Sequence, residues 1–141
     1  MKRTASAVWT GDLKTGKGRL TTGSGVLDGK AYGFRTRFED EPGTNPEELI
    51  GAAHAGCYAM ALSMILGQKD LTAEVINAKA DVTIEQVEGD FAITRSHLTV
   101  RAKVPGASED AFRQAAEAAR KGCPVSKVLK AEITMDASLE G

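Results

Sequence analysis

Alternation between apolar and polar residues predicts three long strands in the second half of the chain. Apolar residues recur at every second position over 76–84, and much the same pattern returns over 92–104, after the turn at 88–90. This pattern is typical of an antiparallel hairpin with one face in solvent. A last alternating run predicts a strand over 131–139. We expect the polar face of the hairpin to be solvated surface; it holds Arg95, His97, Arg101 and Lys103.

The first third of the chain is rich in glycine and predicts short strands joined by turns. The strands are expected at 8–9, 18–22 and 32–38. Turn sequences separate them at 10–12 and 27–30. Short runs of apolar and β-branched residues between glycine-containing turns favour strands of this kind.

A long apolar segment over 49–66 follows a strong signal for the start of a helix. Asn45 can cap the helix, Pro46 suits its first position, and Glu48 completes a pattern similar to a capping box. A helix that is apolar on all sides is normally buried. Its many small residues and His54 argue against a membrane span.

Two further helices are predicted before the last strand. Ser108 caps the first, which ends at Gly122 and places Phe112 and three alanines on one side. Cys123-Pro124 then begins a short helix that extends to Leu129.

This order of strands and helices predicts an α+β fold over one domain, residues 1–141. One chain of this size has trouble surrounding a helix roughly 30 Å long on every side. The small residues of the apolar helix would let a second helix approach closely. We therefore expect a homodimer in which two central helices pack together and the sheets lie outside.

Composition narrows the class of protein. Hydrophobic residues make up 42% and charged residues 26% of the 141 residues, an ordinary globular balance. Lys and Arg number 18 against 19 Asp and Glu, and this net charge of −1 argues against a nucleic-acid partner. The N-terminus shows no apolar signal segment, so we expect a cytoplasmic protein with no membrane partner.

Two cysteines are the first candidates for chemistry, with two inert buried thiols as the simplest alternative. Cys57 lies inside the apolar helix, where burial would raise its pKa, so a reactive Cys57 needs a cation nearby. Cys123 stands at the start of a helix, where free N–H groups favour a thiolate. The sequence Cys123-Pro124-Val125-Ser126 is also similar to a short redox C-x-x-S motif.

Three other polar residues each have a functional and a structural interpretation. His54 lies one helical turn before Cys57 and could pair with it, although a buried histidine with satisfied hydrogen bonds is the more common case. Glu47 could simply complement the helix dipole, and Arg37 could be an exposed strand residue. His54 and the two cysteines lack a fourth zinc ligand, so no metal is expected.

Long motifs of the chain resemble the osmotically inducible protein C (OsmC) family over nearly the whole sequence. The central-helix motif covers residues 44–57, a second motif covers 122–131, and residues 32–38 resemble the third strand of the family. The related organic hydroperoxide resistance proteins share the two cysteines. His54-Ala55-Gly56-Cys57 and Gly16-Lys17-Gly18 are more similar to the OsmC branch.

The resemblance implies a thiol peroxidase with four functional residues. Cys57 would be the peroxidatic cysteine, Cys123 the resolving cysteine, Arg37 the activating cation and Glu47 the residue that orients it. Relatives can draw the cation from the first hairpin instead, so Lys14, Lys17 and Arg19 remain candidates. The implied fold is an intertwined homodimer with antiparallel sheets wrapped around two buried central helices.

The implied activity is reduction of organic hydroperoxides, and of hydrogen peroxide less well, in oxidative or osmotic stress defence. It needs an external dithiol reductant, such as a dihydrolipoyl protein, and no cofactor. One alternative is a non-catalytic dimer that binds a small ligand or acts structurally in stress. Another is a hydrolase that uses a Cys–His pair.

The spacing of Glu47 and Cys57 constrains such a site. Ten residues of unbroken helix separate them by about 15 Å. Either the helix breaks near Gly51 or Gly56, or the partner chain supplies Glu47. An antiparallel pair of helices favours a site shared across the dimer.

Overall fold

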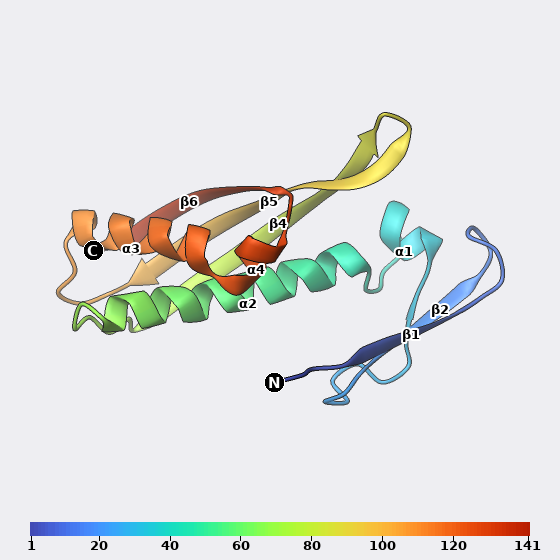
Figure 1. Ribbon diagram of the computed structural model, residues 1–141, viewed down its shortest axis with the longest axis horizontal. Helices are drawn as coiled ribbons and strands as arrows, with labels where there is room; N and C mark the ends of the chain where they lie inside the picture. Colours follow the sequence, from blue (N-terminus) through green and yellow to red (C-terminus); the bar gives the residue numbers. More distant parts are fainter. The chain divides into compact units, whose positions relative to one another are not determined.

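A computed structural model describes all residues, 1–141, and they divide into two units, 1–49 and 50–141. Figure 1 colours the ribbon along the chain and labels its helices and strands where there is room. This division does not test the expectation that the whole chain is a single domain, which stays a prediction.

The first unit contains a small antiparallel sheet, as predicted. Its strands lie in the order β1-β2-β3 and cover Ala5–Thr10, Lys17–Thr22 and Lys30–Tyr32. Trp9 of β1 pairs opposite Gly18 of β2, which in turn pairs opposite Tyr32 of β3. The Trp9 and Tyr32 rings therefore meet across a glycine, with their centroids 5.7 Å apart.

The predicted strand over 32–38 is wrong beyond Tyr32, because the chain turns into a short helix, α1 (Phe34–Phe38). The Thr36 hydroxyl accepts a hydrogen bond from the Gly33 N–H and donates one to the Gly33 carbonyl, each 3.0 Å long. These bonds close the turn. Phe34 and Phe38 are four residues apart and share one helix face, with ring centroids 5.1 Å apart.

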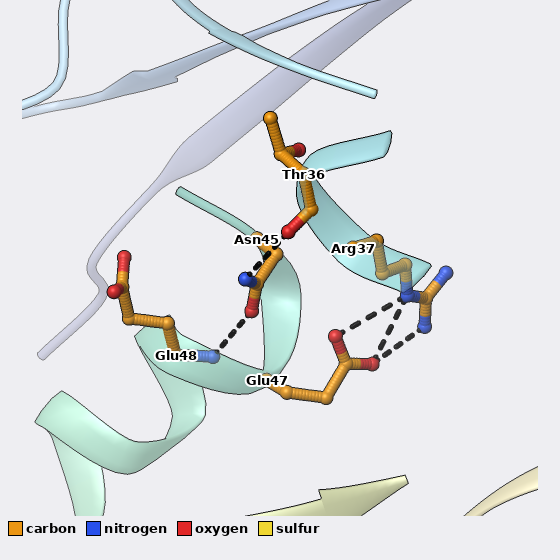
Figure 2. A network of polar contacts seen from close by, with 5 residues as sticks. All are labelled: Thr36, Arg37, Asn45, Glu47 and Glu48. Atoms are coloured by element: carbon orange, nitrogen blue, oxygen red, sulfur yellow. Dashed lines mark hydrogen bonds and ion pairs between the residues drawn. The ribbon is translucent and has the colours of Figure 1, made fainter. Parts of the chain in front are cut away.

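The long helix α2 (Pro46–Gly67) begins where the sequence predicts. The Asn45 side-chain oxygen accepts a 2.8 Å hydrogen bond from the Glu48 N–H and caps the helix. Its amide nitrogen donates to the Thr36 carbonyl at 3.0 Å and so ties this helix start to α1 (Figure 2).

Only one side of α2 is buried within the chain, so the expectation that it is buried all round is not met by a single copy. Tyr58 and Leu62 are fully buried and belong to the hydrophobic core. Met60 and Met64 are 77% and 61% exposed. The helix is long and apolar enough to cross a membrane, but its buried side makes it a core helix.

The second unit holds a three-stranded sheet in the order β4-β5-β6, which covers Val75–Val87, Asp90–Lys103 and Glu132–Glu140. Strands β4 and β5 form the predicted antiparallel hairpin. The expectation of purely antiparallel sheets is wrong, because β6 runs parallel to β5. Two helices follow β5 and return the chain to the same end of the sheet, which makes the parallel pairing possible.

These two helices are α3 (Glu109–Gly122) and α4 (Pro124–Val128). The Ser108 hydroxyl accepts a 3.1 Å hydrogen bond from the Ala111 N–H and caps α3, as predicted. The core of the unit lies between one face of the sheet and helices α2 and α3. Its fully buried members include Leu62, Leu66, Leu98, Ala102, Phe112, Ala115 and Ala119.

The opposite face of the hairpin is mainly solvent-exposed, as predicted for its polar residues. Arg95, Arg101 and Lys103 are exposed, whereas His97 is half-buried. The His97 ring contacts the Thr134 hydroxyl at 2.6 Å and the Asp136 carboxylate at 3.2 Å on the neighbouring strand β6.

Candidate active site

The structure brings Cys57 and Cys123 together within the second unit. Cys57 lies in the middle of α2 and is half-buried, and Cys123 lies between α3 and α4 and is fully buried. Both are free thiols. The Cys123 side chain contributes to the pKa of Cys57 both through a hydrogen bond and through charge, so the two thiols lie against each other.

The surroundings of Cys57 favour the protonated thiol. Burial is the largest influence and raises the pKa of Cys57, and the nearby Cys123 raises this pKa further. A hydrogen bond with the Val125 backbone acts in the opposite direction and lowers it. No positively charged side chain is among the groups that shift this pKa. Within this unit nothing positively charged offsets the effect of burial on Cys57, which agrees with the prediction that a reactive Cys57 needs a cation nearby.

Cys123 occupies the predicted position at the start of α4. Its sulfur accepts a 3.3 Å hydrogen bond from the Ser126 N–H and lies 3.1 Å from the Ser126 hydroxyl. Pro124 takes the first helical position. The C-x-x-S sequence is therefore a helix cap in which the sulfur receives the backbone bond that a serine or aspartate would normally accept.

His54 is a buried histidine with both ring nitrogens satisfied. Nδ1 lies 2.7 Å from the Ser96 hydroxyl on β5, and Nε2 lies 2.8 Å from the Ser126 hydroxyl on α4. The idea of a direct Cys57–His54 pair is wrong, because serines occupy both nitrogens. Burial lowers the pKa of His54, so its ring is neutral at neutral pH.

Arg37 and Glu47 form a close ion pair within the first unit (Figure 2). Arg37 Nη2 donates to the Glu47 carboxylate at 2.7 Å, and Nε donates to its two oxygens at 3.1 and 3.2 Å. The Glu47 side chain is only 7% exposed, compared with 35% for Arg37. The alternative interpretation of Arg37 as a strand residue is wrong, because it lies on α1.

This pairing distinguishes Arg37 from Arg19, another candidate cation. Three hydrogen bonds fix Nε and Nη2 and leave Nη1 to donate elsewhere. Arg19, by contrast, donates to the Gly29 carbonyl at 3.0 Å. A buried carboxylate that accepts hydrogen bonds from one side of a guanidinium is the arrangement expected of a residue that orients the arginine.

Arg37 also lies at the edge of an apolar cleft of about 300 Å³ that the sequence did not predict. Most of its lining is aromatic: Trp9, Leu13, Tyr32, Gly33, Phe34, Arg37 and Phe38. The Arg37 guanidinium carbon lies 5.1 Å from the centroid of the Phe38 ring. The four-residue spacing of Phe34 and Phe38 is the sequence signal that could have indicated this surface.

Helix α2 is continuous from Pro46 to Gly67. The alternative in which it breaks near Gly51 or Gly56 is therefore wrong. Glu47 and Cys57 remain about 15 Å apart along the helix axis.

Two free thiols in contact on an α+β fold are the arrangement expected of a thiol-redox protein. Residues 38–138 match the family of OsmC-like proteins. The chain is 53% identical over 134 residues to peroxiredoxin OsmC of Escherichia coli K12, which covers 95% of this chain and 94% of the relative. It therefore belongs to the OsmC family, as its motifs indicate.

More distant relatives share the fold. The organic hydroperoxide resistance protein OhrB of Bacillus subtilis is 24% identical over 124 residues, 87% of this chain and 89% of the relative. The crystal structure of OhrB superposes with a TM-score of 0.68 over 97% of this chain and 98% of that chain, at 22% identity. An OsmC-like protein of unknown function from Vibrio cholerae superposes with a TM-score of 0.76 over 98% of this chain and 99% of that chain, at 13% identity.

Proposed function

We propose that this protein is a cysteine-based peroxidase that reduces organic hydroperoxides to alcohols, and hydrogen peroxide less well. The observation that supports this most directly is the contact between the free thiols Cys57 and Cys123. The names of the relatives, peroxiredoxin and organic hydroperoxide resistance protein, agree with this activity. The alternative of a non-catalytic dimer gains no support from them.

In the first step the Cys57 thiolate attacks the terminal oxygen of the hydroperoxide. The O–O bond breaks, the terminal oxygen stays on Cys57 as a sulfenic acid, and the other oxygen leaves as an alkoxide that takes up a proton from solvent to become the alcohol. Arg37 favours the thiolate and donates to the leaving oxygen, where negative charge develops. Glu47 holds the guanidinium in place through the three hydrogen bonds described above.

In the second step the Cys123 sulfur attacks the Cys57 sulfenic acid, and water leaves as the disulfide forms. An external dithiol, such as a dihydrolipoyl protein, then reduces the disulfide by thiol exchange. We place the protein in the cytoplasm, where such dithiols keep thiols reduced. This chemistry needs no metal or cofactor and suits a role in stress defence.

The exposed side of α2 favours a homodimer. Besides Met60 and Met64 it includes the small residues Ala52, Ala53 and Gly56, all exposed in one chain. Small residues permit close helix packing, and two copies of this face would bury it. In such a dimer the Arg37–Glu47 pair of one chain would serve Cys57 of the other.

Steady-state turnover with a dithiol donor tests the activity. We expect kcat/KM to be higher for tert-butyl hydroperoxide and cumene hydroperoxide than for hydrogen peroxide, because apolar walls exclude water and favour an organic group. Oxidation of dihydrolipoamide in each case reports turnover. Absence of dithiol oxidation with every peroxide would support the non-catalytic alternative instead. Ester hydrolysis without peroxide reduction would support the hydrolase.

Sedimentation across a wide dilution range tests the dimer. We expect a dimer that does not separate into folded monomers, and we expect Met60→Lys to disrupt it by placing a charge on the apolar face of α2. Val26→Lys is a matched control, because Val26 is 79% exposed in a turn of the first unit. A compact wild-type monomer with native circular dichroism would contradict the prediction.

A further inference from the structure

A continuous buried chain of hydrogen bonds connects Cys123 to the interior of the second unit. It runs from the Cys123 sulfur to the Ser126 hydroxyl at 3.1 Å, on to His54 Nε2 at 2.8 Å, and from Nδ1 to the Ser96 hydroxyl at 2.7 Å. Three of its members are fully buried, and Ser126 is 8% exposed. The peroxidase chemistry described above makes no use of His54.

One order of protons satisfies all four groups when the thiol is protonated. Because burial keeps His54 neutral, one ring nitrogen donates and the other accepts. Nδ1–H donates to Ser96, and Nε2 accepts from the Ser126 hydroxyl. The Ser126 oxygen is then available to accept from the Cys123 S–H group.

The same groups also fit a second proton order in which every contact is retained. If the thiol proton moves to Ser126 and the Ser126 proton moves to His54, the imidazolium donates from both nitrogens to the two serines. The Ser126 hydroxyl and its N–H both donate to the Cys123 thiolate. The charges then form a linked pair, so that no isolated charge is buried.

We propose that His54, acting through Ser126, takes the proton of Cys123 when the disulfide forms. The inference rests on the proposed function and deepens it. In this step the Cys123 sulfur forms the S–S bond with the Cys57 sulfur, and the S–O bond of the Cys57 sulfenic acid breaks. The oxygen leaves as hydroxide and takes up one proton from solvent to become water. His54 afterwards returns its proton to solvent, so atoms and charge balance without a further reactant.

No charged side chain is among the causes that shift the pKa of His54; burial alone lowers it. The titratable residues near His54 on its own helix are Cys57 and Tyr58. The Tyr58 hydroxyl donates to the Ala116 carbonyl at 3.1 Å. β5 contributes the neutral Ser96, and the start of α4 contributes Ser126 and Cys123. Burial is the only cause that lowers the pKa of His54, and no carboxylate raises it. The neutral base is therefore present at and above neutral pH, and it is lost only as the pH falls through its lowered pKa.

Single-turnover oxidation separates this role from the first step. Reduced protein is mixed with excess cumene hydroperoxide, and sulfenic acid on Cys57 is trapped with a dimedone reagent at increasing times. The disulfide is quantified in parallel by mass spectrometry. Sulfenic acid formation on Cys57 tests the proposed function, and its conversion to the disulfide tests the role of His54.

We expect His54→Gln and Ser126→Ala to form the sulfenic acid at nearly the wild-type rate but to form the disulfide about 100-fold more slowly. Ser126→Thr keeps a hydroxyl and should restore much of the rate. Tyr58→Phe is the matched control, since it removes another buried hydrogen bond of α2 that is not part of the hydrogen-bond series from Cys123 to Ser96. It should leave disulfide formation unchanged.

The pH profile distinguishes a base from a merely structural residue. Wild-type disulfide formation should vary little from about pH 6.5 to 8.5, whereas in His54→Gln and Ser126→Ala it should rise by up to about tenfold per pH unit, because hydroxide then removes the proton. Equal disulfide rates and parallel profiles in wild type and variants would overturn the role of His54. A wild-type protein that forms neither sulfenic acid on Cys57 nor the Cys57–Cys123 disulfide would instead overturn the proposed function. If His54→Gln fails to fold, Ser126→Ala and Ser126→Thr decide the matter.

Discussion

Replacement of Cys57 by serine should abolish peroxidase turnover, while replacement of Cys123 by serine should leave one rapid round of peroxide reduction. The reason is the order of the two steps. A serine hydroxyl at Cys57 cannot attack the O–O bond at a useful rate. Without Cys123 the sulfenic acid still forms but has no neighbouring thiol with which to condense.

Stopped-flow measurement of peroxide consumption distinguishes the two variants. Cys123→Ser should consume one equivalent of hydroperoxide per chain in a burst, and Cys57→Ser should consume none. Cys123 is fully buried and Cys57 is half-buried, which agrees with Cys57 as the thiol that meets the substrate. A burst in Cys57→Ser with none in Cys123→Ser would reverse the assignment.

Arg37→Ala should slow the reaction of Cys57 with hydroperoxide by about 10²–10³-fold at neutral pH. Burial holds the pKa of Cys57 above its ordinary value, so loss of the cation leaves a smaller fraction of thiolate. The rate of Arg37→Ala should recover as the pH rises. Stopped-flow rates from pH 6 to 10 measure this shift, and an unchanged profile would transfer the role to Lys14, Lys17 or Arg19.

Glu47→Ala should slow the reaction less than Arg37→Ala, because in the proposed site Glu47 orients the cation and does not contact the thiol. The double variant should be about as slow as Arg37→Ala alone, since residues that act as one network are not additive. Glu48→Ala provides a matched control. Glu48 is also acidic and in the first turn of α2, but it contributes only its backbone N–H to the cap.

A mixed dimer tests which chain supplies the ion pair. One chain carries Cys57→Ser and the other carries Glu47→Ala, so the intact Cys57 faces an intact Glu47 only if the site is shared. We then expect near-normal activity per intact thiol. If Glu47 serves its own chain, the mixed dimer should be as slow per thiol as the Glu47→Ala homodimer.

Local signals in the sequence predicted the start of α2 and most of the second unit. Asn45 and Pro46 marked the start of α2, and the alternating residues of β4 and β5 marked a hairpin. Cys123 before Pro124 predicted a helix start, and its sulfur does cap α4. These features depend on neighbours within a few residues, which is why they can be predicted without the tertiary structure.

The features that the sequence did not predict depend on contacts between distant segments or on very short elements. A five-residue helix such as α1 is too short for its period to stand out from a strand. The direction of β6 depends on the path of α3 and α4, and alternation is the same in either direction. Ser96 is 42 residues from His54 in the chain, so no local pattern could join them.

The position of the first oxidation product tests the central claim most directly. Wild-type protein is treated with one equivalent of cumene hydroperoxide and digested without reduction, and the Cys123→Ser variant is treated in the same way with a dimedone reagent present. Peptide mass spectrometry should show a Cys57–Cys123 disulfide in the wild type and a trapped sulfenic acid on Cys57 in the variant. Two reduced thiols in the wild type, or sulfenic acid trapped on Cys123 and never on Cys57, would contradict the account.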